Sequence, residues 1–170
     1  MIDTNAYIGG YPFRHIPHPE PAILARVLER EKLDGAWVGH LPSAFYRDPT
    51  PGNDELFAAL APHPHLRPAP SIRPDWPGWE RALASAIDRG ARAVRAYPPQ
   101  WGLGPDDASM RSLCTACGEA GIALATVHGA FRLVVYRDKL SDATHLALVR
   151  GPVSPDTETL VRVHEPLSVM

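Results

Sequence analysis

Several side chains that could do chemistry lie at two-residue spacing in the first apolar run of the chain. Asp3, Asn5 and Tyr7 alternate with apolar residues, so in a strand all three share one face. They could line a pocket and hydrogen-bond a polar substrate, or satisfy one another inside the fold. His128 ends a later apolar run, where a general base or a hydrogen-bonded structural histidine would both fit. His40 closes another such run in the same way.

Arginines follow the expected ends of other strands. Arg73 and Arg95 lie at or beyond two of these ends, and Arg14 follows the first. A guanidinium binds a carboxylate with two parallel hydrogen bonds, so a carboxylate substrate is one interpretation. An arginine at a strand end can also tie a loop to the surface. We predict Asn5, Tyr7, Arg73 and Arg95 as substrate-binding candidates and leave the structural alternative open.

The elements that must position these residues alternate between strands and helices. Prolines and glycines mark the junctions, because proline cannot donate to a ladder and glycine tolerates a left-handed backbone. The predicted strands are Met1–Gly9, Gly35–Leu41, Leu66–Arg73, Ala91–Tyr97 and Ile122–His128. The predicted helices are Pro21–Leu33, Asn53–Leu60 with Asn53 as its cap, Pro77–Arg89 and Ala108–Ala120.

This alternation predicts parallel strands joined by right-handed crossovers over residues 1–129. Two α/β architectures fit: a partial (β/α)₈ TIM-like barrel of about five βα units, or an open doubly wound parallel sheet. The helical rhythm stops after Gly129, so residues 130–170 are predicted to form a separate, irregular, divergent or truncated tail. Three short segments of the tail could be strands: Phe131–Tyr136, Leu146–Arg150 and Thr159–His164.

Four segments in chain order carry a resemblance to amidohydrolase-related proteins of the metal-dependent hydrolase, TIM-barrel type. They are DTNAYIGGYPFR at Asp3–Arg14, Asn53 with Leu56, HPHLRPAPSIRP at His63–Pro74 and GARAVRAYP at Gly90–Pro98. The resemblance covers roughly the first three quarters of the chain. It implies a barrel whose active site lies at the carboxyl ends of the strands.

The resemblance also implies where a metal would bind. Typical members carry H-x-H on the first strand, but Asn5 and Tyr7 occupy those positions here, in a branch that reads D-x-N. An amide and a phenol are poor zinc ligands. His128 matches a ligand histidine of the family, and Asp3 is the other candidate metal ligand and catalytic residue. The family's later ligands have no counterpart, so the expectation is no metal in the isolated chain, with a divalent zinc site as the alternative.

Composition excludes several classes of partner. Seventeen Lys and Arg are balanced by nineteen Asp and Glu, for a net charge of −2, so neither nucleic acid nor a membrane surface is an expected partner. The start of the chain has no secretory pattern, and the expected compartment is the cytoplasm. Cys114 and Cys117 lie within a predicted helix and are expected to be buried thiols.

Three hypotheses of function follow. The first is an amidohydrolase-type hydrolase or decarboxylase of a small carboxyl or carbonyl compound, in which His128 and Asp3 polarise water and Arg95 or Arg73 holds an anion. The second is a non-catalytic, truncated remnant. The third is a small-ligand binding module that forms a homo-oligomer to cover an open sheet edge.

Overall fold

The computed structural model describes residues 1–13, 20–104, 107–126, 129–137 and 144–149, and from Ala125 to Leu148 it describes the backbone alone. The strands of the first half are β1 (Ile2–Ile8), β2 (Gly35–His40), β3 (Leu66–Pro68), β4 (Ala93–Val94) and β5 (Ala123–Thr126). The helices are α1 (Pro21–Arg30), the 3₁₀ turn η1 (Leu41–Phe45), α2 (Thr50–Leu60), α3 (Trp79–Asp88), α4 (Pro98–Trp101) and α5 (Ala108–Glu119).

The first five strands are parallel and follow one another in chain order. β1, β2 and β3 form one sheet, and β4 pairs with β5. A parallel bridge between Ser71 and Arg95 joins the two groups. The structure is therefore a mixed α/β fold with parallel sheets, and the described strands do not close into a barrel.

The long helices α1, α2, α3 and α5 pack against one side of these strands, as the described core clusters show. Alternate residues of β1, β2 and β3 pack against α1 and α2, with Ala36, Val38 and Leu56 fully buried. Ile72 and Val94 pack in the same way against Leu83 of α3 and Leu113 of α5. The other side has a smaller cluster, in which the buried Ala69 and Ala93 pack with the partly buried Trp37 and Ala123. A doubly wound sheet has helices on both faces, so this one-sided arrangement differs from it, and we call the side without long helices the inside of the arc.

β3 is shorter than predicted because Pro68 and Pro70 have no backbone N–H to continue the ladder. The helix after β2 also begins earlier than predicted. Pro49 is the N-cap of α2, so the expected capping role of Asn53 is wrong. Asn53 is buried inside the helix instead, and its side chain reaches the chain that follows β3.

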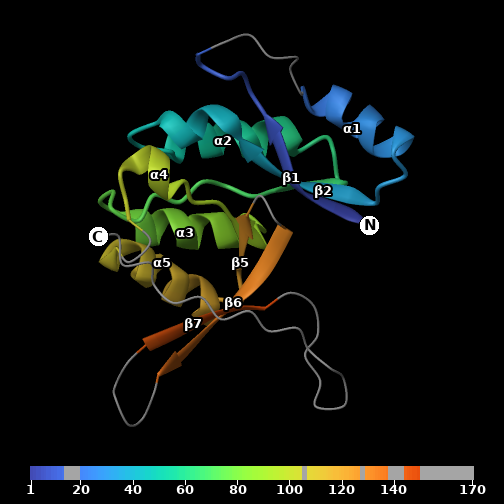
Figure 1. Ribbon diagram of the computed structural model, residues 1–170. Coiled ribbons are helices and arrows are strands. Elements are labelled where there is room, and N and C mark those ends of the chain that lie inside the picture. The colour runs from blue at the N-terminus through green and yellow to red at the C-terminus, as the bar shows by residue number, and fades with distance from the viewer. Residues whose placement is uncertain (14–19, 105–106, 127–128, 138–143, 150–170) are drawn as a thin grey trace, which may run out of the picture.

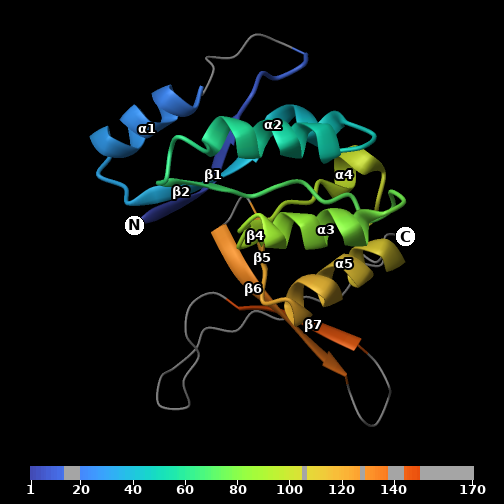
Figure 2. The ribbon, with the colours of Figure 1, turned by 180° about the vertical axis from the view of Figure 1, so that it is seen from behind.

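The expectation of an irregular tail is wrong for two described segments. β6 (Gly129–Arg137) pairs antiparallel with β5, and β7 (Thr144–Val149) pairs antiparallel with β6. Figures 1 and 2 show this hairpin beside α5, at the end of the molecule opposite α1 and α2, while the predicted strand Thr159–His164 lies outside the described residues. The helical rhythm does stop at β5, but a regular hairpin replaces it.

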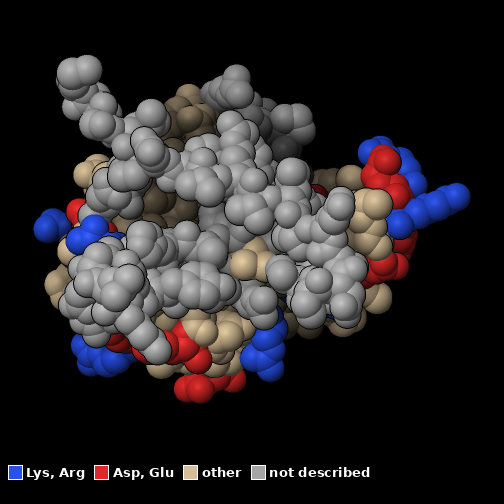
Figure 3. All heavy atoms as spheres, turned by 60° about the horizontal axis from the view of Figure 1, so that its bottom comes forward, with Lys and Arg blue, Asp and Glu red and all other residues tan. Residues whose placement is uncertain are grey.

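Surface charge agrees with the balanced composition. On the face shown in Figure 3, acidic and basic side chains of the described residues lie side by side around the edges, without a patch of one sign. No helix in the described part of the chain is long and apolar enough to cross a bilayer. The prediction of buried thiols is confirmed, since Cys114 and Cys117 are free and buried within α5.

Candidate functional site

The centre of the arc is filled by the side chain of Arg95, which follows β4 and is 2% exposed. Its Nη1 donates to the Asn5 side-chain oxygen at 3.2 Å and to the Tyr7 hydroxyl at 3.0 Å. Its Nη2 donates to the carbonyls of Thr4 at 2.9 Å and Trp37 at 3.1 Å. Arg95 therefore joins β4 to β1 and β2 across the inside of the arc.

Glycine makes this position possible. A Cβ atom on Gly39 would lie 2.7 Å from both Cδ and Nε of Arg95, closer than packed atoms approach. Gly39 pairs with Tyr7 in the β1–β2 ladder, and the guanidinium lies 4.4 Å from the centre of the Tyr7 ring. The missing side chain at Gly39 thus leaves the room that the arginine occupies.

The charge of Arg95 has no counter-charge among the described residues. All of its acceptors are neutral, and no described carboxylate forms an ion pair with it. A buried cation without an anion is costly unless its hydrogen bonds compensate. Four of its five N–H groups have acceptors, and Nε has none within the described part of the chain.

Two hydroxyl groups beside Arg95 are also without a hydrogen-bond partner among the described residues. These are Ser71 Oγ, on the residue that bridges to Arg95, and Tyr97 Oη, two residues further along the chain. Burial raises the pKa of the Tyr97 phenol, and the nearby Tyr7 phenol raises it further, so Tyr97 remains a neutral hydrogen-bond donor. Arg95 Nε, Ser71 Oγ and Tyr97 Oη, at the carboxyl ends of β3 and β4, therefore have no well-formed hydrogen bond among the described residues, and the Ser71 hydroxyl lies near enough to Tyr97 to lower the pKa of its phenol.

The position of Ser71 is fixed from outside the arc. The Asn53 side chain of α2 accepts from Ser71 N and donates to Ser71 O, both at 2.8 Å. This pair of bonds replaces the ladder that β3 no longer makes with β2 after Ala69, so that the Asn53 amide stands where a neighbouring strand would be.

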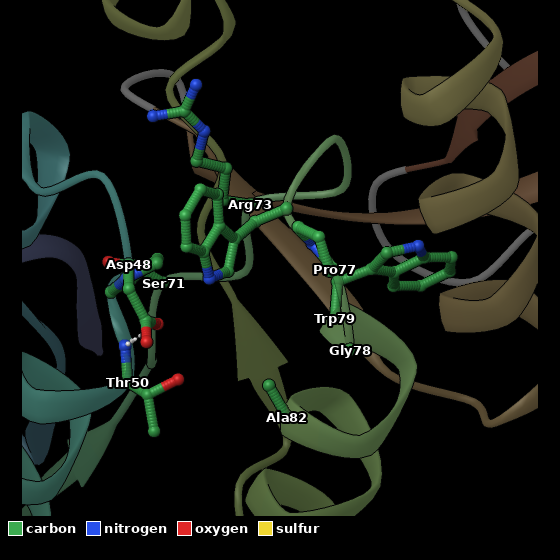
Figure 4. A pocket seen from close by; sticks show the side chains of 10 residues that line it. Asp48, Thr50, Ser71, Arg73, Pro77, Gly78, Trp79 and Ala82 are labelled. Carbon is green, nitrogen blue, oxygen red and sulfur yellow. Dashed lines mark hydrogen bonds between the residues drawn. The ribbon is translucent and has the colours of Figure 1, made fainter.

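A small cavity of about 60 Å³ opens beside Ser71, between the start of α2 and the loop before α3. Figure 4 shows Asp48 and Thr50 on one side of it, with Arg73 and Trp79 extending away from them. Arg73 makes two hydrogen bonds of 2.9 Å to the Asp75 carboxylate, and this ion pair holds the pKa of Asp75 below its usual range. The guanidinium of Arg73 is therefore already paired with a carboxylate of its own loop.

His40 lies on the opposite side of the sheet from Arg95. It pairs in the ladder with Ile8, whose side chain packs in the core cluster that α1 and α2 cover. Paired residues of a ladder point to the same side, so His40 faces the helices. Its Nδ1 lies 2.8 Å from Ser43 Oγ, and its Nε2 lies 3.5 Å from Glu55 Oε2. His40 is thus separated from the interior of the arc.

The predicted site residues are only partly brought together. Asn5, Tyr7 and Arg95 meet inside the arc, but the expectation that Asp3 shares their face is wrong. The β1–β2 register shifts between Asp3 and Ala6, which pairs Asp3 with the helix-facing Ala36. Asp3 accepts a hydrogen bond from Asn5 N in an exposed position. His128 lies outside the described residues, so its predicted catalytic and metal-binding roles stay predictions.

Sequence reasoning missed Ser71 and Tyr97. The signal available was the two-residue spacing of Ala69 with Ser71 and of Arg95 with Tyr97, which places both hydroxyls on the inner face. The predicted strands included both residues, but proline-rich sequence around Ser71 drew attention to the turn and away from its side chain.

The described inner face does not fit a divalent cation. The oxygens of Asn5 and Tyr7 both accept hydrogen bonds from the positively charged Arg95. A metal ion at those oxygens would lie beside a guanidinium and be repelled by it. No described group of three His, Cys, Asp or Glu side chains could supply another ligand set.

Comparison with protein families gives a match at the end of the chain. Residues 118–170 match the family model of GTP cyclohydrolase II, a range that takes in the last turn of α5, β5 and the β6–β7 hairpin. Two Neisseria meningitidis proteins named 3,4-dihydroxy-2-butanone 4-phosphate synthase are 69% and 67% identical to this chain over 45 residues. The aligned part is 26% of this chain and 12% of each relative, so the chain spans about an eighth of their length.

Solved structures give a different name. A 2-pyrone-4,6-dicarboxylic acid hydrolase from Pseudomonas putida has a TM-score of 0.48 and 22% identity, covering 72% of this chain and 46% of the other. A protein of the same name from Acinetobacter baumannii, with citric acid bound, has a TM-score of 0.49 and 11% identity, covering 72% and 47%. The structural neighbours thus carry a hydrolase name, whereas the sequence relatives are named as synthases.

Proposed function

We propose that this chain is a hydrolase-like protein whose parallel half binds a small compound with a carboxyl or carbonyl group at the carboxyl ends of β3 and β4. The observation that carries the proposal is the set of three buried, unpaired donors: Arg95 Nε, Ser71 Oγ and Tyr97 Oη. A carboxylate presents two oxygens with about four lone-pair sites, so it can accept from all three.

The charge of Arg95 favours the same ligand. Arg95 is a permanent cation whose protein acceptors are all neutral, so burying its charge is unfavourable. An anion beside Nε would offset this cost by forming a charge-assisted hydrogen bond.

No hydrolytic step can be assigned to the described residues. Hydrolysis needs a base to activate water, and the predicted base, His128, lies outside them. What the described residues supply is orientation: Arg95, Ser71 and Tyr97 would hold the carboxyl or carbonyl group while a proton acceptor acts elsewhere. Binding without turnover by the purified chain would favour the small-ligand binding module over the hydrolase.

The proposal is tested by titrating the chain with small mono- and dicarboxylates and following binding by calorimetry. Ser71→Ala and Tyr97→Phe each remove one donor and should weaken binding by roughly three- to tenfold. Tyr11→Phe removes an equivalent hydroxyl from a different loop and is the matched control. Equal affinity in all four proteins would contradict the proposal, as would no binding by the wild-type chain.

A second candidate function is favoured by the match at residues 118–170. In this alternative the C-terminal segment contributes part of a GTP cyclohydrolase II-type domain, which the match of residues 118–170 to that family model supports. Saturation-transfer NMR with GTP separates the two. Contact of GTP with β6 or β7 and no carboxylate binding would favour the second candidate over the first.

A further inference from the structure

A second buried polar cluster lies on the helix side of the sheet, at the carboxyl end of β2. It is built around the His40 ring. His40 is 5% exposed and Ser43, its partner in η1, is fully buried. Glu55 approaches the other ring nitrogen from α2, and its own side chain is largely exposed. One imidazole therefore connects the end of β2, the η1 turn and the second turn of α2.

The His40 ring packs closely against the backbone of two glycines, Gly52 and Gly9. A Cβ atom on Gly52 of α2 would lie 2.1 Å from Ser43 Oγ and 2.5 Å from His40 Nδ1. A Cβ atom on Gly9, which has φ +85°, would lie 3.1 Å from the other edge of the ring. Because the ring is packed from both sides, it cannot turn to find new partners while the surrounding loops keep their positions.

This packing defines one protonation state. The Glu55 carboxylate accepts only, so it favours the tautomer with hydrogen on Nε2, and Nδ1 is then free to accept from the Ser43 hydroxyl. A second proton must go to Nδ1. The buried Ser43 hydroxyl would then have to reverse its hydrogen bond and find another acceptor for its hydrogen.

We propose that His40 is a pH-sensitive lock on the loops at the carboxyl ends of β1 and β2, and that its protonation releases η1 from the start of α2. This inference is independent of the ligand site, which lies on the other side of the sheet. The released turn would carry Phe45, which packs edge-to-face against Tyr11 at 5.6 Å and Phe13 at 5.1 Å. Acidification would therefore also loosen the aromatic cluster of the β1–α1 loop.

The electrostatics around the ring support the direction of the effect. Burial lowers the pKa of His40 below its ordinary value of 6.5, and Glu55 partly opposes this. The other described titratable group that faces the ring is Tyr46, at 6.0 Å between ring centres. A lowered pKa in the folded state means that the unfolded chain binds the proton more readily. The stability that neutral His40 contributes is present above pH 6.5 and is lost as the pH falls below it.

Hydrogen exchange followed by mass spectrometry tests this lock. After correction for intrinsic rates, amides of Leu41–Tyr46 should exchange roughly three- to tenfold faster at about pH 5.5 than at about pH 7.5. Glu55→Gln removes the group that raises the pKa of His40, so the transition should move to lower pH. His63→Gln, which changes a histidine outside the cluster, should leave the transition in place.

The result that would overturn the proposal is an acid transition that is unchanged in Glu55→Gln or absent from the wild-type chain. His40→Gln should abolish the transition while keeping a polar side chain at this position. If that variant fails to fold, NMR titration of the His40 ring in wild-type protein and in Glu55→Gln decides the matter, since equal midpoints would contradict the lock.

Discussion

Tyr7 and Gly39 face the inside of the arc, whereas the next paired residues of the same strands, Ile8 and His40, face the helices. Inside, a permanent cation is surrounded by neutral acceptors and leaves donors unpaired. Outside, a neutral imidazole has partners on both ring nitrogens, and one of them is a carboxylate. This difference is the basis of both proposals: a ligand that would complete the inner cluster, and an outer cluster whose partners depend on the protonation of His40.

The largest expected effect comes from removing the charge at the centre of the inner cluster. Arg95→Met keeps much of the volume but removes the side-chain donor to the Thr4 and Trp37 carbonyls, and we expect a loss of about 3–5 kcal/mol in unfolding free energy. Chemical denaturation followed by circular dichroism measures it. A loss below about 1 kcal/mol would mean that the inner hydrogen bonds do not hold the arc together.

The second largest loss of stability should come from the clasp, by which we mean the two hydrogen bonds between the Asn53 side chain and the Ser71 backbone. Asn53→Ala removes both bonds to the Ser71 backbone in a buried position, and the expected loss is about 2–4 kcal/mol. The same denaturation experiment measures this loss. If the clasp also orients Ser71 toward its ligand, carboxylate affinity should fall in parallel. A variant that loses stability but binds carboxylates with full affinity would show that Asn53 stabilises the fold without orienting Ser71 for binding.

A methyl group added at the inner glycine tests how tightly Arg95 is packed. Gly39→Ala places a Cβ atom 2.7 Å from Cδ and Nε of Arg95, whose Nη1 and Nη2 are held by hydrogen bonds, so we expect a loss of about 1–3 kcal/mol in unfolding free energy. Gly90→Ala is a comparison at a glycine with open space around its Cβ position, although its φ of +91° adds strain. Thermal unfolding of Gly39→Ala at the wild-type temperature would show that the guanidinium can move aside.

The smallest expected effect is on the surface between α2 and α3. Asp54→Ala breaks the ion pair with Arg89, in which both side chains are more than one third exposed, and should cost about 0–1 kcal/mol. Added salt should reduce the difference further, as thermal unfolding at low and high ionic strength would show. A larger loss at this site than at Asn53 would contradict the account of where the stability lies.

Sequence reasoning predicted the parallel strands and the helices of the first half because glycine, proline and apolar spacing mark them clearly. It could not predict the shift of register between Asp3 and Ala6, which depends on the pairing with β2 and moves Asp3 to the other face. Asn53 was taken for a cap because it precedes acidic residues, but its amide satisfies a strand that prolines interrupt. Two of the three possible tail strands, Phe131–Tyr136 and Leu146–Arg150, do fall on β6 and β7, but their antiparallel pairing into a hairpin was not predicted, because it depends on contacts with β5.

The most direct test of a ligand-completed inner cluster is the NMR signal of the Arg95 Nε–H group during titration with acetate. The account predicts a saturable downfield shift of this signal as Nε gains an acceptor, while the signal of Arg73 Nε, already bonded to Asp75, stays in place. An Arg95 signal that does not move while Arg73 does would contradict it, because the anion would then have found the surface arginine and left the buried one unpaired.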